Sequence, residues 1–166
     1  MRLHDLLHSG YLANLPLSRL DWALAQMLQH AQPSDDARHL WLAALTSHQW
    51  SRGHACLDLN ALQRDPASCL GWTPEQVARL PQALTHDAPE AAASLPWCAG
   101  EASPLVYAKP SARLYLRRAW QAEQTIRQAL RERVQHPASV DAPLTPLIDG
   151  WLDDLFGPAP TGDRAA

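Results

Sequence analysis

The sequence predicts a mainly α-helical fold that carries a small antiparallel β-sheet of two or three short strands. Alanine and leucine dominate the 166 residues, while valine and isoleucine are scarce. This balance favours helix, because β-branched side chains are the usual strand formers. Hydrophobic residues make up 46% of the chain, so we expect a packed domain rather than disorder. Fourteen prolines and seven glycines divide it into short elements.

The two N-terminal helices follow from caps and apolar spacing. A short amphipathic helix is expected over residues 4–12. A clearer helix is expected over 17–30, where Ser18 is the cap and Asp21 is the acid of a capping box. The apolar face of this second helix is expected to comprise Leu20, Leu24, Met27 and Leu28.

A third helix is expected to begin at the cap Ser34. Asp35 and Asp36 would then lie against the positive end of the helix dipole. The helix should end near residue 48, with the loop QWSRG after it. The side chains expected to be buried along it are Leu40, Trp41, Ala44 and Leu45.

The middle of the chain predicts shorter elements. The segment HACLDL, residues 54–59, has the composition of a short strand, and LNALQR predicts a helical turn. Thr73 begins another helix, because proline follows this cap and glutamine stands three residues after it. Residues 85–104 are rich in alanine and proline, and we expect an irregular connection there.

The C-terminal third predicts a hairpin followed by two helices. LVYAK and ARLYL, joined through a Pro-Ser turn, are typical of a β-hairpin, to which HACLDL would add a third strand. A long helix begins near Arg117, and a last helix is expected over 146–156. We expect residues 1–156 to form one domain and 157–166 a linker. The apolar stripe of the long helix comprises Leu116, Ala119, Trp120, Ile126, Leu130 and Val134.

The charge pattern separates two ends of the molecule, although the net charge is only −3. Residues 113–133 carry six arginines and two glutamates, whereas 141–163 carry five aspartates and no basic residue. The chain therefore lacks a global basic field that would attract nucleic acid. Three cysteines do not suggest a disulfide framework, and no apolar run has the length of a membrane span or the form of a signal peptide. We expect a soluble cytoplasmic protein.

Candidate metal and catalytic residues lack the spacing that such sites require. No CxxC or HxxxH pair links His48, His54, Cys56, Cys69 and Cys98, so ordinary packing is preferred over a zinc site. No GxSxG motif supports a nucleophilic site built from Ser47, His48 and Asp58. The last helix carries Asp149, Asp153 and Asp154, for which a solvated acidic face is preferred over a Mg²⁺ site.

The arginine-rich helix is the strongest candidate for binding. We expect Arg117, Arg118 and Arg131 to lie off its apolar stripe and reach solvent. Three interpretations stay open: a solvated helix face, a protein interface, and a DNA-binding module that uses residues 117–133. An interface would also leave apolar side chains exposed, for which the candidates in loop-like positions are Trp50, Trp72 and Trp97.

Glu123 stands within the apolar stripe, near Trp120. An unpaired buried carboxylate is costly, so we expect Glu123 to pair with Arg127, one helical turn further on, with Arg113 or Arg117 as the alternatives. Trp120, Glu123 and Arg127 would then form a structural lock that holds the helix against the hairpin.

Three stretches together resemble one protein family. SHQWSRGHACLDLNAL, LVYAKPSARLYLRRAWQAEQTI and LIDGWLDDLFGP are similar to segments near the N-terminus of the α subunit family of exodeoxyribonuclease V, the RecD helicase subunit. Their order and approximate spacing agree, while residues 63–104 give no support.

The resemblance implies a helical N-terminal accessory domain of a 5′-to-3′ DNA helicase that acts in double-strand-break repair. It implies docking chiefly against a RecC-type γ subunit, with a RecB-type β subunit in the same complex and DNA reached through that complex. The chain has neither GxxxxGK[ST] nor GxGxxG. ATP and Mg²⁺ are therefore expected only in a motor region absent from this sequence, and no activity is expected of this chain alone.

Overall fold

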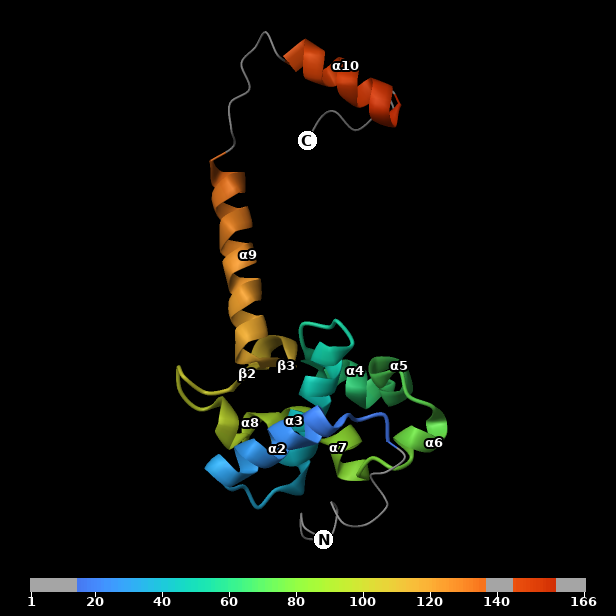
Figure 1. Ribbon diagram of the computed structural model, residues 1–166, viewed down its shortest axis with the longest axis vertical. Helices are drawn as coiled ribbons and strands as arrows, with labels where there is room; N and C mark the ends of the chain where they lie inside the picture. The colour runs from blue at the N-terminus through green and yellow to red at the C-terminus, as the bar shows by residue number, and fades with distance from the viewer. Residues whose placement is uncertain (1–14, 137–144, 158–166) are drawn as a thin grey trace. The chain divides into compact units, whose positions relative to one another are not determined.

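The structure is a computed structural model that describes residues 15–136 and 145–157 (Figure 1). Within these residues helices predominate and one small sheet is present, which confirms the predicted fold class. The chain divides into two compact units, Met1–Thr125 and Ile126–Ala166. A single domain ending at residue 156 stays a prediction. The helix expected over residues 4–12 lies outside the described residues.

Helix α2 (Arg19–Ala31) begins with the predicted capping box. The Asp21 carboxylate accepts hydrogen bonds from the backbone N–H and hydroxyl of Ser18, both at 2.8 Å. The predicted apolar face is confirmed for Leu28, which is buried, and for Leu24, which packs against the core. It is wrong for Leu20 and Met27, which are 68% and 57% exposed. Oδ2 of the buried Asp21 accepts both bonds from Ser18, whereas Oδ1 has no hydrogen-bond partner among the described residues. The buried side chains of α2 are Asp21, Ala25 and Leu28.

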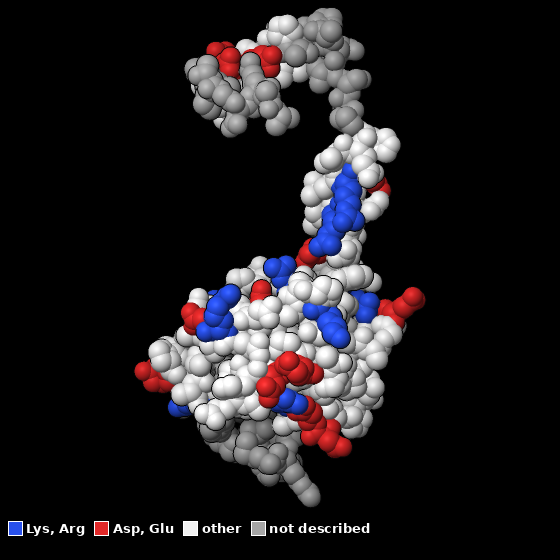
Figure 2. All heavy atoms as spheres, turned by 180° about the vertical axis from the view of Figure 1, so that it is seen from behind, with Lys and Arg blue, Asp and Glu red and all other residues white. Residues whose placement is uncertain are grey.

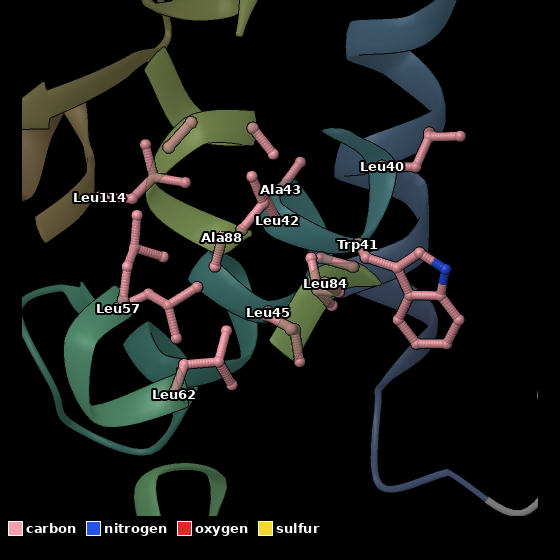
Figure 3. Packing of buried hydrophobic residues seen from close by; sticks show 14 of the residues in the cluster. Leu40, Trp41, Leu42, Ala43, Leu45, Leu57, Leu62, Leu84, Ala88 and Leu114 are labelled. Carbon is pink, nitrogen blue, oxygen red and sulfur yellow. The ribbon is translucent and has the colours of Figure 1, made fainter. Parts of the chain in front are cut away.

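Helix α3 (Ala37–Ser51) is the centre of the first unit. Every residue from His39 to Gln49 is buried, as expected of a helix with neighbours on all sides. The prediction that it ends near residue 48 is wrong, because the helical hydrogen bonds continue to Ser51. Figure 3 shows Leu42 and Leu45 of α3 among side chains from other elements, which include Leu57, Leu62, Leu84 and Ala88.

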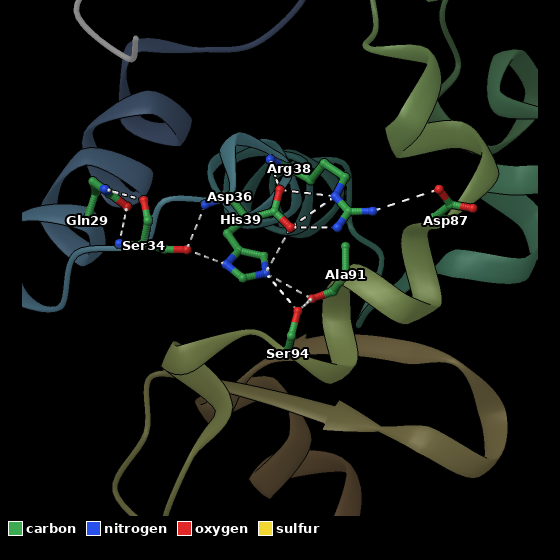
Figure 4. Close-up of polar contacts among 8 residues, drawn as sticks. All are labelled: Gln29, Ser34, Asp36, Arg38, His39, Asp87, Ala91 and Ser94. Atoms are coloured by element: carbon green, nitrogen blue, oxygen red, sulfur yellow. Dashed lines mark hydrogen bonds and ion pairs between the residues drawn. The ribbon is translucent and has the colours of Figure 1, made fainter. Parts of the chain in front are cut away.

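The start of α3 is capped by Asp36 rather than by the predicted Ser34. Asp36 accepts a hydrogen bond from the backbone N–H of Arg38 at 2.9 Å, and the Arg38 guanidinium donates to both of its carboxylate oxygens. These bonds hold the pKa of Asp36 below its ordinary value. Ser34 instead bonds the ring of His39, at 2.7 Å from Nδ1 (Figure 4).

His39 joins this loop to α8 (Ala88–Ala93). Its Nε2 lies 3.0 Å from the carbonyl oxygen of Ala91. A carbonyl only accepts, so Nε2 carries the proton and Nδ1 accepts from Ser34. Burial lowers the pKa of His39, which keeps the ring neutral. The hydrogen bonds of the neutral His39 ring therefore hold the loop at Ser34 against α8.

The sheet has the strand order β1-β3-β2 and is antiparallel throughout. Strands β2 (Leu105–Ala108) and β3 (Arg113–Leu116) form the predicted hairpin through the short 3-10 helix η2 (Lys109–Ser111). Strand β1 (Leu57–Asp58) supplies the predicted third strand, and Leu57 pairs with Leu114. Both leucines are fully buried, so the sheet closes one side of the core.

Short helices connect α3 to the hairpin. They are α4 (Leu59–Arg64), α5 (Pro66–Leu70), α6 (Pro74–Val77), α7 (Gln82–His86), α8 and the 3-10 helix η1 (Pro96–Cys98). The turn LNALQR and the Thr73 capping box are confirmed. The prediction that residues 85–104 are irregular is wrong for 88–93, where buried alanines let α8 approach α3 closely.

Two further helices complete the described chain. Helix α9 (Arg117–Gln135) begins where the sequence predicts and continues from the first unit into the second. Helix α10 (Thr145–Phe156) matches the predicted last helix. Within residues 15–136 and 145–157, none of the helices combines the length and the apolar character needed to cross a membrane.

Candidate docking surface

An apolar groove opens on the first unit where three parts of the chain meet. Helix α2 and the end of α3 supply one part each, and the junction of the sheet with α9 supplies the third. The groove has a volume of about 370 Å³. Its lining consists of Leu20, Leu24, Ser47, Trp50, Ser51, Pro104, Leu116, Arg117 and Arg118.

Two side chains make this groove apolar at the solvent boundary. Leu20 is 68% exposed because α2 turns Asp21 inward in its place. Trp50 is 40% exposed because the last turn of α3 carries it past the buried residues that end at Gln49. Large apolar side chains this exposed and this close together are typical of interaction surfaces.

The guanidinium of Arg118 lies over the ring of Trp50, with its central carbon 4.8 Å from the ring centroid. A cation–π contact at an exposed position contributes on the order of 0.5–1 kcal/mol. Arg118 is itself exposed, so the contact positions its charge at the edge of the groove without removing it from solvent.

Arg117 has a different environment from its neighbour. Its side chain is half-buried and donates hydrogen bonds to the carbonyl oxygen and hydroxyl of Ser103 and, at 3.1 Å, to the carbonyl oxygen of Gly100. Arg117 was expected to reach solvent, and it does so only in part. Its guanidinium ties the start of α9 to the loop before β2, and contact with a partner stays a prediction.

The second unit contains the other predicted arginine, Arg131, which is exposed on α9. Together with Arg127, Leu130, Val134 and Gln135 it lines a shallow hollow of about 300 Å³. Figure 2 shows basic side chains along one side of α9. The apolar stripe predicted for this part of the helix is present but exposed, at 61% for Ile126, 55% for Leu130 and 80% for Val134.

The predicted lock of Trp120, Glu123 and Arg127 lies on the same helix. Trp120 and Glu123 are half-buried and Arg127 is exposed, so Glu123 is not the fully buried carboxylate that the sequence indicated. Burial raises the pKa of Tyr115 on β3, and the negative charge of Glu123 contributes in the same direction. Glu123 thus lies near the sheet, and the lock stays a prediction.

Two of the three tryptophan candidates belong to the core. Trp97 is 2% exposed and donates a hydrogen bond to the carbonyl oxygen of Gln32 at 2.9 Å. Trp72 is 5% exposed and donates to Nε2 of His48 at 3.0 Å. Only Trp50 among them is available to a partner, and it lies on a helix rather than in a loop.

The residues considered for nucleophilic catalysis make contacts that hold the fold together. His48 accepts from Trp72 through Nε2, so its proton is on Nδ1, which lies 3.9 Å from the buried carboxylate of Asp21. Burial lowers the pKa of His48, and the charge of Asp21 opposes that shift. Asp58 caps α4 by accepting from the backbone N–H of Ala61 at 2.9 Å. These groups do not converge on a common reacting position.

The candidate metal ligands are also dispersed. Over residues 15–136 and 145–157, no three His, Cys, Asp or Glu side chains gather in a way that would hold a metal ion. Burial raises the pKa of Cys69 to about 11 and that of Cys98 to about 12, so both thiols stay protonated at neutral pH. On α10, Asp149 is half-buried and Asp153 and Asp154 are exposed.

Sequence reasoning identified Arg118 and Trp50 but missed the groove between them. It had assigned Leu20 and Leu24 to the core and did not consider Pro104 or Leu116 for binding. A signal was present in the capping box. Oδ2 of Asp21 accepts hydrogen bonds from Ser18 within the same turn, and the side chain turns inward, which leaves its neighbour Leu20 toward solvent.

The family described as RecBCD enzyme subunit RecD, N-terminal domain, matches residues 14–115. This range includes α2, α3 and nearly all of the hairpin, which supply the greater part of the groove. A search of curated proteins found no match to the chain.

Proposed function

Since the chain belongs to the family of RecD N-terminal domains of the RecBCD enzyme, we propose that it is a non-catalytic docking domain. It attaches the RecD-type helicase subunit to a RecBCD-type complex. The RecC-type γ subunit is its main partner, and the RecB-type β subunit belongs to the same assembly. The complex unwinds DNA during double-strand-break repair, and ATP and Mg²⁺ act in the motor region of the helicase subunit.

The observation that carries this proposal is the exposed apolar groove at Leu20 and Trp50. A domain that served only as a covalent spacer would gain nothing from leaving such side chains in water. At a protein interface they would be buried, and tryptophan is enriched at the centres of such interfaces. The chain sequence also has no phosphate-binding loop, which supports a role in assembly rather than in catalysis.

The direct test is co-purification of this chain with the RecC-type subunit from the same cell, at low and at high salt. We expect co-elution at both, because apolar contacts are screened far less than contacts between exposed charges. A Leu20→Asp variant should reduce co-elution, while Met27→Asp, at an exposed site on the same helix outside the groove lining, should not. Failure of the unaltered chain to co-elute would overturn the proposal.

A second candidate is a DNA-binding module, favoured by the basic side of α9 (Figure 2). It predicts affinity for DNA that falls steeply with salt, with a logarithmic slope of about −0.9 for each phosphate contacted. Arg131→Glu should then weaken DNA binding and reduce that slope by about one contact. Arg117 is a poor test position, because its guanidinium stabilises the loop at Ser103.

A further inference from the structure

We infer that the groove binds an amphipathic helix of the partner protein, whose apolar side chains enter the groove and whose edge carries a carboxylate that pairs with Arg118. This inference rests on the proposed docking function and specifies the partner surface. It follows from three features of the groove: its lining, its backbone and its charge.

The lining selects an apolar ligand over nucleic acid. Five of its side chains are apolar, namely Leu20, Leu24, Trp50, Pro104 and Leu116. Phosphate binding needs several cations that follow a backbone. The groove offers only one available cation among its lining residues, Arg118, because the hydrogen bonds of Arg117 go to Gly100 and Ser103.

The backbone at the groove favours a helix over an added strand. Strand addition requires a sheet edge with unpaired N–H and C=O groups. The sheet residue in the lining, Leu116, pairs with Leu105 of β2, and the lining includes no residue of the edge strands β1 and β2. Pro104, immediately before β2, has no N–H to donate. Leu20 and Leu24 instead present one helical turn of α2, and the apolar side chains of a second helix can pack against such a ridge.

The charge at the edge selects a carboxylate on the ligand. Arg118 is held over Trp50 at 4.8 Å and stays exposed, so little side-chain entropy is lost when it pairs. A docked helix would cover the indole face and lower the local dielectric around the guanidinium. The attraction between Arg118 and an opposing carboxylate would then be stronger, whereas an opposing cation would be repelled.

The test uses the chain bound to the RecC-type subunit, with the photo-reactive residue p-benzoylphenylalanine in place of Leu20. The matched control carries it in place of Met27, on the same helix but outside the groove lining. We expect the Leu20 probe to cross-link to a helical segment of the partner that has an Asp or Glu within one turn. The Met27 probe should give no cross-link to that segment.

The charge pairing is tested by reversal and rescue. Arg118→Glu should weaken binding of the partner by roughly tenfold or more, and replacing the identified carboxylate with lysine should restore most of the loss. Arg64→Glu, at an exposed arginine that ends α4 and lies outside the groove lining, is the control and should leave affinity within about twofold.

The outcomes separate this inference from the proposed function. If the complex forms but the Leu20 probe reacts with an extended segment, a basic helix or nothing, the inference is overturned while docking stands. If the swapped charges fail to rescue binding, the pairing with Arg118 is overturned. If no complex forms, the proposed function fails and the inference fails with it.

Discussion

Helices α3 and α9 both carry apolar side chains at helical spacing, but α3 is the more apolar of the two and the two helices have different environments. In α3 every residue from His39 to Gln49 is buried. In α9, from Ile126 onward, every residue is exposed, including the three members of the apolar stripe in that part, Ile126, Leu130 and Val134. The difference shows that an apolar stripe predicts a packing partner for a helix but does not indicate which element supplies that partner. For α3 the neighbours are α2, α8 and the sheet.

The contrast has an energetic consequence. Burial of apolar side chains is the main favourable contribution to folding. The described core belongs to the first unit, and α9 beyond Thr125 and α10 add little to it. Stability should therefore depend on the first unit, and substitutions at exposed apolar positions of the second should affect binding or solubility instead.

The largest effect is expected when the core of α3 is opened. Leu45 has no exposed surface, so Leu45→Ala should lower the free energy of unfolding by about 2–5 kcal/mol. Leu155→Ala is the matched control on α10, where the side chain is 75% exposed, and it should cost less than about 0.5 kcal/mol. Urea unfolding followed by tryptophan fluorescence measures both. Equal losses would contradict the division of the molecule into a stabilising unit and an exposed one.

A smaller effect is expected where α9 joins the body. Arg117→Met keeps most of the apolar stem but removes the hydrogen bonds to Gly100 and Ser103. Hydrogen bonds from a charged donor contribute about 1.5–3 kcal/mol, and the same unfolding measurement should show a loss of that order. Arg131→Met, at an exposed site on the same helix, is the control and should show no loss. If Arg117→Met left the free energy of unfolding unchanged, the loop before β2 would not depend on these hydrogen bonds.

The third effect depends on pH. Burial lowers the pKa of His48 and of His39, so the folded state binds fewer protons than the unfolded state below about pH 6.5. Stability should therefore fall as the pH drops through this value, with a slope of at most about 1.4 kcal/mol per pH unit for each histidine. His48→Gln, whose amide can still accept from Trp72, should reduce the slope. An unchanged slope would show that His48 is not protonated on unfolding.

How far the sequence predicted the fold depended on whether the signal was local. The capping boxes at Ser18 and Thr73, the hairpin and the start of α9 were predicted correctly, because each is specified by adjacent residues. The cap of α3 was predicted at Ser34, whereas Asp36 caps the helix. The inward face of α2 was predicted wrongly at Leu20 and Asp21, since the usual rule places leucine inside and aspartate outside. The hydrogen bonds of the capping box override that rule at Asp21.

The candidate site was less predictable for the same reason. Arg118 and Trp50 are 68 positions apart in the chain, and their cation–π contact depends on how α3 packs beside the sheet. Periodicity predicted that Arg117 and Arg118 both face solvent. Arg117 instead bonds to the loop at Ser103 while Arg118 stays exposed, and this difference depends on where that loop lies in the fold. Features formed by elements distant in the chain could not be predicted from the sequence alone.

The smallest effect is expected at Leu130, which is 55% exposed on the stripe of α9. A lysine there meets solvent, has good helix propensity, and should change the free energy of unfolding by less than about 0.5 kcal/mol. Chemical unfolding of Leu130→Lys beside the unaltered chain is the measurement. A clear loss would mean that the stripe is packed in solution and that α9 resembles α3 after all. No loss, combined with weaker binding to the RecC-type subunit, would make the stripe a second contact surface, independent of the groove at Trp50.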